Sequence, residues 1–323
     1  MTKMTRERSV KSGKSVAVVD VGSNTIKLLV AELSSRGDLK VLHEKSDATR
    51  IESQHSASGL VLTVNGMHAG LKAIERLIQE SLPCEPVQIR IVATGLVRDS
   101  VNGKLFAERV REVTGYELDI ISGDEEATGV ALGVGTDSSL SNRSNYLVCD
   151  LGGGSLELIR VENRIVRATV SLPLGAVRLA KRFVSNARAP SLQSEMVVIA
   201  AHVHQTLSSS GFPFPPSPSF MVATGGAFAT ARAVFAEAKN ISFDECAILS
   251  VSDLSRFLTE SASLTIDQRV ERFPPLPIER ADIMPTALLV ISILLEYANA
   301  SEVHHSLRNL RFGLAAKLLD CAN

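Results

Sequence analysis

The chain has 323 residues, 45% of them hydrophobic and 4% aromatic, and its formal net charge at pH 7 is −1. The length predicts about two domains, and the near-zero charge excludes a bulk basic field of the kind that attracts nucleic acid or a membrane surface. A polyanionic ligand would therefore have to be held by a few placed cations and by backbone N–H groups.

The four cysteines and the first residues of the chain predict a protein of the reducing cytoplasm. The cysteines form no C-x-x-C pair, so we expect neither a disulfide framework nor a zinc site. Residues 1–14 are basic without an apolar segment, which predicts a disordered tail rather than a signal peptide. The longest apolar stretch, 287–295, is much shorter than the roughly 20 residues that span a bilayer.

The first predicted elements are two apolar strands joined by an acidic glycine turn. Residues 16–33 read VAVVDVGSNTIKLLVAEL, with Asp20 at the end of the first strand and Gly22 in the turn. Glycine permits positive φ and brings backbone N–H groups close to a bound anion, while the aspartate can hold a divalent cation or a water beside it. For one such copy alone, an ordinary hairpin is the more frequent explanation.

Further along the first half, the apolar spacing predicts a helix of about three turns behind Asn65. A β-rich segment at 87–94 follows, and Arg98 stands at the corner where this strand meets the next helix. The guanidinium of Arg98 offers a planar fork to phosphate oxygens. A surface ion pair with Asp99 or Glu108 is an equally frequent role, so both remain open.

Glu125 and Glu126 open a helix behind the turn Ser122-Gly123. Acidic residues in a first helical turn often only compensate the helix dipole, and for Glu125 this explanation and a functional one are evenly balanced. A cleft that holds phosphate needs one base to activate water. We predict that Glu126 is this base, with a pKa raised by the neighbouring negative phosphates.

The polar segment TDSSLSNRSN at 136–145 predicts the boundary between two domains. We place the first domain at 15–135 and the second at 136–323. The last helix, expected at about 308–319, is a candidate for packing back onto the first domain.

The second half repeats the acidic glycine turn in the same register. Residues 146–163 read YLVCDLGGGSLELIRVEN, and Asp150 lies 130 residues after Asp20, so that Gly152 aligns with Gly22 without a gap. A third glycine turn, with the pair Gly225-Gly226, stands between a predicted strand and a predicted helix. This arrangement binds anions. The repetition favours two related halves that grip one phosphorylated ligand from both sides of a cleft.

Other polar residues are less informative. Arg178 stands among apolar neighbours, and a partly buried arginine of this kind is expected to have a fixed anionic partner. His202 and His204 are two residues apart on a predicted helix and cannot share a metal. We expect His304 and His305 to form a solvent-exposed pair in a loop.

Strands and helices alternate in both halves, which predicts α/β layers. Seven segments resemble, in family order, the motifs of the exopolyphosphatase and guanosine pentaphosphate phosphohydrolase family. They are VVDVGSNTIKLLVAE (18–32), VATGLVRDSVNG (92–103), ISGDEEATGVALGV (121–134), LVCDLGGGSLELI (147–159), SLPLGAVRLAKRF (171–183), VATGGA (222–227) and ERADIMPTALLV (279–290). The resemblance implies the fold of actin, Hsp70 and sugar kinases, in which two duplicated ribonuclease-H-like domains enclose an interdomain cleft.

The same resemblance implies roles for single residues. Glu126 matches the catalytic base of the family, and Asp150 and Glu157 match the carboxylates that hold Mg²⁺, with Mn²⁺ as a second candidate. The residues that match the substrate-binding positions are Ser23, Asn24, Lys27, Arg98, Gly152, Gly153, Gly154, Ser155 and Gly225. Four positions depart from the family pattern: Thr128, Leu156, Ala227 and Phe312. They bear on substrate affinity, chain-length preference and full activity, and they motivate the alternative of a sensor without catalysis.

The resemblance implies an Mg²⁺-dependent exopolyphosphatase that releases terminal phosphate from inorganic polyphosphate. Hydrolysis of pppGpp, ATP-dependent kinase activity and phosphate-chain sensing without catalysis are the alternatives, and the motif SGDEE at 122–126 counts against a kinase. A linear phosphate chain is favoured over a nucleotide because no evident aromatic platform for a guanine base is found in the sequence. No nucleic acid or membrane partner is expected, and a homodimer is left open.

Overall fold

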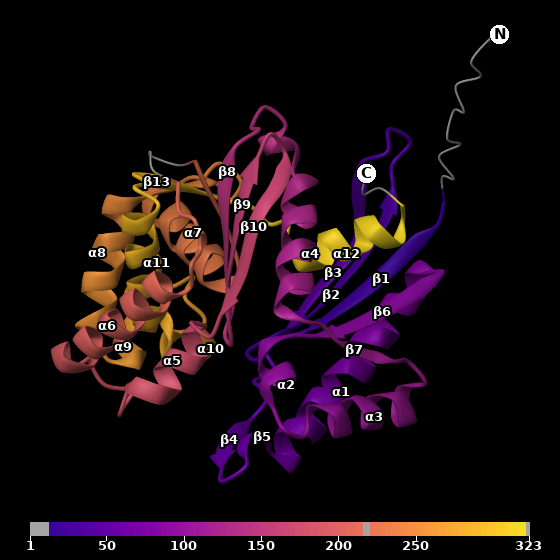
Figure 1. Ribbon diagram of the computed structural model, residues 1–323, viewed down its shortest axis with the longest axis horizontal. Coiled ribbons are helices and arrows are strands. Elements are labelled where there is room, and N and C mark those ends of the chain that lie inside the picture. The colour runs from indigo at the N-terminus through magenta and orange to yellow at the C-terminus, as the bar shows by residue number, and fades with distance from the viewer. Residues whose placement is uncertain (1–12, 216–219, 321–323) are drawn as a thin grey trace.

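The computed structural model describes residues 13–215 and 220–320, so the predicted tail lies almost wholly outside the described residues. Two large mixed sheets dominate the fold, and helices cover their faces (Figure 1). The first sheet has five strands in the order β3-β2-β1-β6-β7. These strands are β1 Ser15–Val21, β2 Ile26–Leu33, β3 Leu39–Asp47, β6 Gln88–Ala93 and β7 Leu118–Ile120.

The second sheet repeats this arrangement and adds one strand, in the order β10-β9-β8-β11-β13-β12. Its strands are β8 Tyr146–Leu151, β9 Leu156–Glu162, β10 Ile165–Leu172, β11 Met221–Thr224, β12 Ile248–Ser250 and β13 Glu302–His305. A separate two-stranded hairpin consists of β4 Ser53–Ser56 and β5 Gly59–Leu62.

The two acidic glycine turns occupy the same place in the two sheets. β1 pairs antiparallel with β2 and parallel with β6, and β8 pairs antiparallel with β9 and parallel with β11. Asp20 lies opposite Lys27 in the first hairpin, and Asp150 lies opposite Glu157 in the second. The halves thus share strand order and register, as a duplicated domain requires.

Helices α1 Val64–Ser81 and α3 Gly103–Thr114 share one apolar core with the first sheet. α1 begins after Thr63, whose side chain accepts a hydrogen bond from the Gly66 N–H. It runs for 18 residues and is therefore longer than predicted. Gly115 ends α3 with a φ of 76°, the left-handed conformation that favours glycine at this position. Two short elements, the 3-10 turn Leu82–Cys84 and α2 Gly95–Asp99, flank β6.

Helices α4 Gly123–Gly135 and α12 Leu310–Leu318 lie between the two sheets (Figure 1). α12 packs against α4, β1 and β2, so the last described helix lies on the first half of the molecule. A Cβ on Gly313 would overlap the carbonyl oxygen of Gly129, and one on Gly133 would overlap that of Asn309. Only glycine permits the two helix backbones to come this close.

The other helices belong to the second half. They are α5 Ala176–Phe183, α6 Gln193–Ser209, α7 Gly226–Lys239, α8 Val251–Ala262, α9 Ile266–Arg272, α10 Ile278–Ala281 and α11 Met284–Tyr297. α11 is buried along most of its length and packs against α6 and α8, as expected for a core helix. None of the described helices is long and apolar enough to cross a membrane.

The expectation of a solvent-exposed His304-His305 loop was wrong. Both residues lie in β13, between β11 and β12, and His305 is 2% exposed. Burial, with the positive charge of Arg232 adding to it, lowers the pKa of His305 to about 3, so the ring is neutral at physiological pH. The predicted boundary segment, 136–145, contains a 3-10 turn, Ser138–Leu140. The domain limits themselves stay a prediction.

Candidate active site

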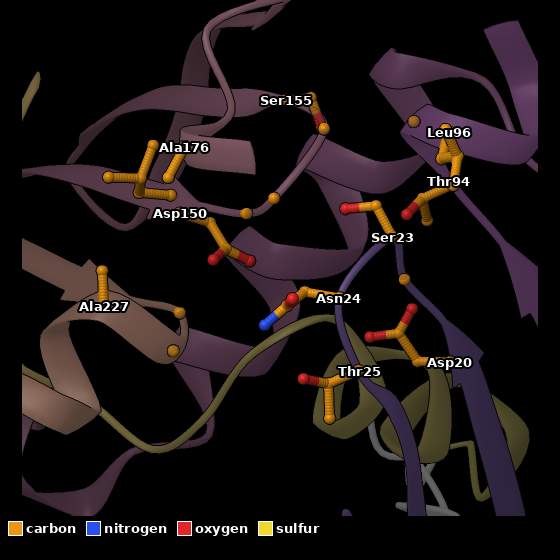
Figure 2. Close-up of a pocket in the computed structure, with 18 of the residues that line it drawn as sticks. Asp20, Ser23, Asn24, Thr25, Thr94, Leu96, Asp150, Ser155, Ala176 and Ala227 are labelled. Atoms are coloured by element: carbon orange, nitrogen blue, oxygen red, sulfur yellow. The ribbon is translucent and has the colours of Figure 1, made fainter. Parts of the chain in front are cut away.

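A cavity of about 100 Å³ lies where the turns of the two sheets meet (Figure 2). All of the predicted site residues except Arg98 line it. They are Ser23, Asn24, Lys27, Glu126, Asp150, Gly152, Gly153, Gly154, Ser155, Glu157 and Gly225. Residues from both halves of the chain, more than 100 positions apart, therefore share one space.

The first turn contributes polar side chains to this cavity. Ser23 and Asn24 are each 8% exposed, and Figure 2 shows both side chains pointing into the space between the turns. The Ser23 hydroxyl is buried without a hydrogen-bond partner among the described residues. Burial, with the charge of Arg311 adding to it, lowers the pKa of Lys27, while Asp20 opposes that change. An anion would satisfy both the free hydroxyl and the ammonium group.

The second turn contributes backbone N–H groups. Its carbonyls accept hydrogen bonds from α5: Gly152 O from Ala176 N at 3.0 Å, Gly153 O from Arg178 N at 3.0 Å, and Gly154 O from Arg178 Nε at 2.7 Å. In a planar trans peptide the N–H of the next residue points opposite to the carbonyl. The N–H groups of Gly153, Gly154 and Ser155 therefore point away from α5. Successive N–H groups arranged in this way form an anion-binding concavity.

The third glycine turn joins β11 to α7. Gly225 has a φ of 104°, which favours glycine, and a Cβ there would lie 2.5 Å from the Leu151 carbonyl oxygen and 2.9 Å from Asp150 Oδ1. The turn therefore packs directly on the end of β8. This close contact brings the N-terminus of α7 to the cavity, where its free N–H groups favour an anion.

The capping box of α4 separates the two neighbouring glutamates. The Ser122 hydroxyl accepts a hydrogen bond from the Glu125 N–H at 3.2 Å, and the Glu125 carboxylate accepts one from the Ser122 N–H at 2.9 Å. Glu125 is exposed and caps the N-terminus of α4, which favours the structural over the functional explanation of this residue. Glu126 points inward and is 7% exposed.

The environment of Glu126 suits a proton acceptor. Arg98 Nη1 donates to Glu126 Oε2 at 2.8 Å. Burial raises the pKa of Glu126 to about 7, with Asp20 and Asp150 adding to the rise and Arg98 opposing it. A carboxylate with this pKa can both accept and release a proton near neutral pH, which is the property of an efficient general base.

Two further carboxylates, the partly buried Asp150 and the buried Glu157, face each other across β8 and β9 and line the same cavity. Burial raises the pKa of both, and for Glu157 the negative charges of Glu126 and Asp150 add to the rise. Ser171 Oγ donates to Glu157 Oε1 at 2.8 Å and fixes that side chain. A cation would relieve the cost of these crowded, desolvated charges.

The donor set fits a magnesium site shared with a ligand. The described residues contain no group of three or more His, Cys, Asp or Glu side chains that could hold a metal by themselves. Mg²⁺ characteristically binds through one or two carboxylates and completes its shell with water and substrate phosphates. Asp150 and Glu157 offer this number of carboxylates, so the residues present are compatible with the predicted ion.

Arg98 and Arg178 are held by protein acceptors, and both lie near the Asp99 carboxylate. Besides its bond to Glu126, Arg98 Nε lies 3.6 Å from Asp99 Oδ1. Arg178 has the anionic partner that was expected, since it forms an ion pair with Asp99 from the other half of the molecule. Arg98 therefore acts on the cavity through Glu126 and does not line it.

Thr25 and Arg280 are polar cavity residues that sequence reasoning missed. Arg280 Nη2 lies 3.5 Å from Thr25 Oγ1, and its guanidinium packs so closely on Gly226 that any Cβ there would overlap it. Burial, with the charge of Arg50 adding to it, lowers the pKa of Arg280. The alignment of the two repeats places Thr25 opposite Ser155, which could have identified it. Arg280 lies in the family-like segment at 279–290, for which no role of a single residue was predicted.

These features define a two-domain α/β protein whose interdomain cleft combines three glycine turns, cationic side chains and carboxylates. A site of this class is suited to phosphorylated ligands. The model of the Ppx/GppA phosphatase family matches residues 29–321. The chain belongs to this family, which confirms the resemblance found in the sequence.

Curated relatives agree with this assignment. The guanosine-5'-triphosphate,3'-diphosphate pyrophosphatase of Vibrio atlanticus is 25% identical over 313 residues, which cover 94% of this chain and 59% of that protein. The protein of the same name from Pseudoalteromonas translucida is 31% identical over 190 residues, 57% of this chain and 36% of that protein. The chain thus spans less than two thirds of the length of these relatives.

Solved structures confirm the fold. An exopolyphosphatase from Cytophaga hutchinsonii superposes with a TM-score of 0.83 at 20% identity and covers 96% of this chain and 99% of that one. The Ppx/GppA family member of Aquifex aeolicus superposes with a TM-score of 0.77 at 22% identity, covering 95% and 98%. The duplicated, actin-like arrangement of ribonuclease-H-like domains predicted from the sequence is therefore present.

Proposed function

We propose that the protein is an exopolyphosphatase that hydrolyses the terminal phosphate of inorganic polyphosphate with the help of Mg²⁺. One observation carries the proposal: Glu126, with a pKa of about 7, is buried in the same cavity as the glycine turns of both halves. A group able to accept a proton, next to groups that suit phosphate, supports this reaction. Membership of a phosphatase family supports the same reaction class.

In this proposal each part of the site has one task. Lys27, the Ser23 hydroxyl and the N–H groups of the second turn hold the terminal phosphoryl group and offset the charge that develops on its oxygens. Glu126 accepts a proton from water while the water oxygen attacks the terminal phosphorus. The bond from that phosphorus to its bridging oxygen breaks, and the shortened chain leaves with the electron pair. Arg98 keeps the Glu126 carboxylate in place.

Asp150 and Glu157 are the residues that would hold Mg²⁺, or Mn²⁺ in its place. When bound, the ion neutralises phosphate charge and polarises the phosphoryl group. The two carboxylates belong to one hairpin, with the Ser171 hydroxyl fixing Glu157 from the neighbouring strand β10.

The altered family positions favour an enzyme over a sensor without turnover. Leu156 is 0% exposed within the core, Phe312 is 3% exposed, and Thr128 is on the exposed side of α4. Of the four departures only Ala227 lines the cavity. The proposed base and metal carboxylates are all retained, so these substitutions act on packing and affinity rather than on the chemical step.

A second candidate, pppGpp hydrolysis, is favoured by a cavity of about 500 Å³ that adjoins the site at Ser23, Gly153 and Gly154. Among the described residues, no acidic side chain lines this cavity. Its apolar lining residues are Ile51, Leu60, Leu96, Pro173, Val177 and Leu179, and its basic ones are Arg178, Lys181, Arg182 and His202. A nucleoside would gain from an apolar wall, whereas a bare phosphate chain would use only the cations. The names of the curated relatives point the same way.

Phosphate release from long polyphosphate, tripolyphosphate, pppGpp and ATP, measured side by side with and without Mg²⁺, tests these candidates. The proposal expects the highest kcat/KM for polyphosphate. A clear preference for pppGpp selects the second candidate, and tight binding of tripolyphosphate without any turnover selects the sensor.

A further inference from the structure

Arg50 links the first turn to the second domain. It lies in the connection between β3 and β4, and its guanidinium donates to four acceptor atoms on three residues. Nε donates to Asn24 Oδ1 at 2.8 Å, Nη1 and Nη2 donate to the two Asp282 carboxylate oxygens at 2.7 and 3.2 Å, and Nη2 also donates to the Glu279 carbonyl at 2.9 Å. Asp282 stands between α10 and α11, on the opposite side of the cleft.

The bond to Arg50 determines which end of the Asn24 amide faces the cavity. An asparagine side chain has one acceptor, Oδ1, and one donor group, Nδ2H₂. Because Oδ1 accepts from the guanidinium, Nδ2 is left for the cavity, and Figure 2 shows the nitrogen of Asn24 pointing into the space between the turns. The reversed amide would set two donors against each other and turn a carbonyl oxygen toward the phosphate site.

We propose that Arg50 is a positioning residue that couples closure of the two domains to anion binding. Its guanidinium holds the Asn24 amide with the N–H donors toward the terminal phosphate, and Asp282 and the Glu279 carbonyl hold the guanidinium. Domain opening removes these anchors from Arg50, so the Asn24 donors are presented fully only in the closed cleft. This inference rests on the proposed role of the cleft as a phosphate site.

The geometry distinguishes this arrangement from an incidental surface ion pair. Bidentate pairing of an arginine with a carboxylate fixes the plane of the guanidinium. The same plane then directs Nε at Asn24, which is 8% exposed. Arg50 does not line the cavity itself; it reaches the cavity through its hydrogen bond to Asn24, while its charge also acts on Arg280, so the double-mutant cycle with Asn24 is needed to isolate the first route.

A double-mutant cycle on binding tests the coupling. Tripolyphosphate affinity is measured by calorimetry at fixed Mg²⁺ for the wild type, Arg50→Met, Asn24→Ala and the double variant. We expect Arg50→Met to weaken binding about tenfold, and to cost less than about threefold once Asn24 is already alanine, because residues in one network are not additive. Losses that multiply independently would overturn the inference, as would unchanged affinity in Arg50→Met.

Three further variants complete the test. Arg188→Met removes the same charge from an exposed pair with Asp267 and should leave affinity unchanged. Asp282→Asn removes the anchor alone and should weaken binding less than Arg50→Met, with a more open cleft in small-angle scattering. If Arg50→Met fails to fold, Arg50→Lys carries the same cycle, since an ammonium group cannot make the three-sided contact.

The outcome is separable from the proposed function. A wild-type protein that binds tripolyphosphate without hydrolysing it refutes the exopolyphosphatase proposal and leaves the Arg50 cycle measurable. A wild type that does not bind tripolyphosphate overturns both.

Discussion

The two glycine hairpins share one backbone frame and differ in where their polar groups come from. The first turn carries the side chains of Ser23, Asn24 and Thr25, whereas the aligned positions of the second are two glycines and Ser155. Opposite the strand-end aspartates, the aligned positions hold Lys27 in one hairpin and Glu157 in the other. One hairpin therefore supplies side-chain donors and a cation, and the other supplies backbone donors and a second carboxylate.

Packing between the turns explains why they are not alike. A Cβ on Gly153 would overlap the Ser23 hydroxyl and lie 3.1 Å from Val177 Cγ2. A Cβ on Gly175 would overlap the backbone of Gly153 and Gly154. Where the turns meet, only one of them has room for side chains, so the second must bind through its backbone. Duplication provided the frame, and close approach made its two copies complementary.

The largest effect is expected from the residue that stands between the two hairpins. Glu126→Gln removes the proton acceptor and keeps the shape, so kcat for polyphosphate should fall about 10²–10⁴-fold while KM changes little. Steady-state phosphate release measures both constants. Glu125→Gln is the matched control, since that side chain serves only the capping box and should alter kcat little. Near-normal kcat in Glu126→Gln would show that another group takes the proton.

The next prediction tests the charge difference between the hairpins. Asp150→Asn should raise the Mg²⁺ concentration for half-maximal activity by about tenfold or more, as is usual for losses at a metal site. Asp20→Asn, the same change in the first hairpin, should raise it much less, because Lys27 rather than a carboxylate faces Asp20. Magnesium titrations of the two variants decide the point. A larger effect for Asp20→Asn would assign the metal to the first hairpin.

A smaller effect is expected from the contact between Gly153 and Ser23. Gly153→Ala should destabilise the fold by about 1–3 kcal/mol, as overpacking of a close contact typically does. Ser23→Gly in the same chain removes the overlapping hydroxyl and should restore part of that loss, because the two residues are in contact. Chemical denaturation gives the free energy of unfolding of the wild type, both single variants and the double variant. Equal losses with and without Ser23→Gly would refute the steric explanation.

The sequence allowed the local parts of this comparison to be predicted. The hairpins and their shared register follow from short segments whose spacing is visible in the chain, and the roles expected for Glu126, Asp150 and Glu157 follow from the resemblance of these segments to the family motifs. The partners of Arg50 and Arg280 were not predictable in this way, because Arg50 and Asp282 are 232 residues apart and meet only when the two sheets face each other. His305 was misjudged for the same reason. Two adjacent histidines indicate a polar loop, and only the neighbouring strands β11 and β12 reveal a buried strand.

The pH dependence of activity should follow the titration of Glu126. The base must be ionised to accept a proton, so kcat/KM should rise with pH and level off above a midpoint near 7. The stability of the fold should change with pH in the opposite direction. The pKa of Glu126 is higher in the folded than in the unfolded state, so the folded state binds this proton more tightly. The contribution of the protonated Glu126 to the free energy of unfolding is therefore fully present below about pH 4.5 and is lost as the pH rises through about 7.

The smallest predicted effect is a displacement of that midpoint, and it draws on both hairpins at once. The negative charges of Asp20 and Asp150 each add to the raised pKa of Glu126, one from each turn. Asp20→Asn removes one of them without touching the proposed metal carboxylates, so the acidic limb of kcat/KM should move to lower pH. Arg98→Met removes the opposing positive charge and should move the limb to higher pH. Profiles measured at saturating Mg²⁺ and constant ionic strength compare the variants, and an acidic limb that stays fixed in both would mean that a group other than Glu126 controls it.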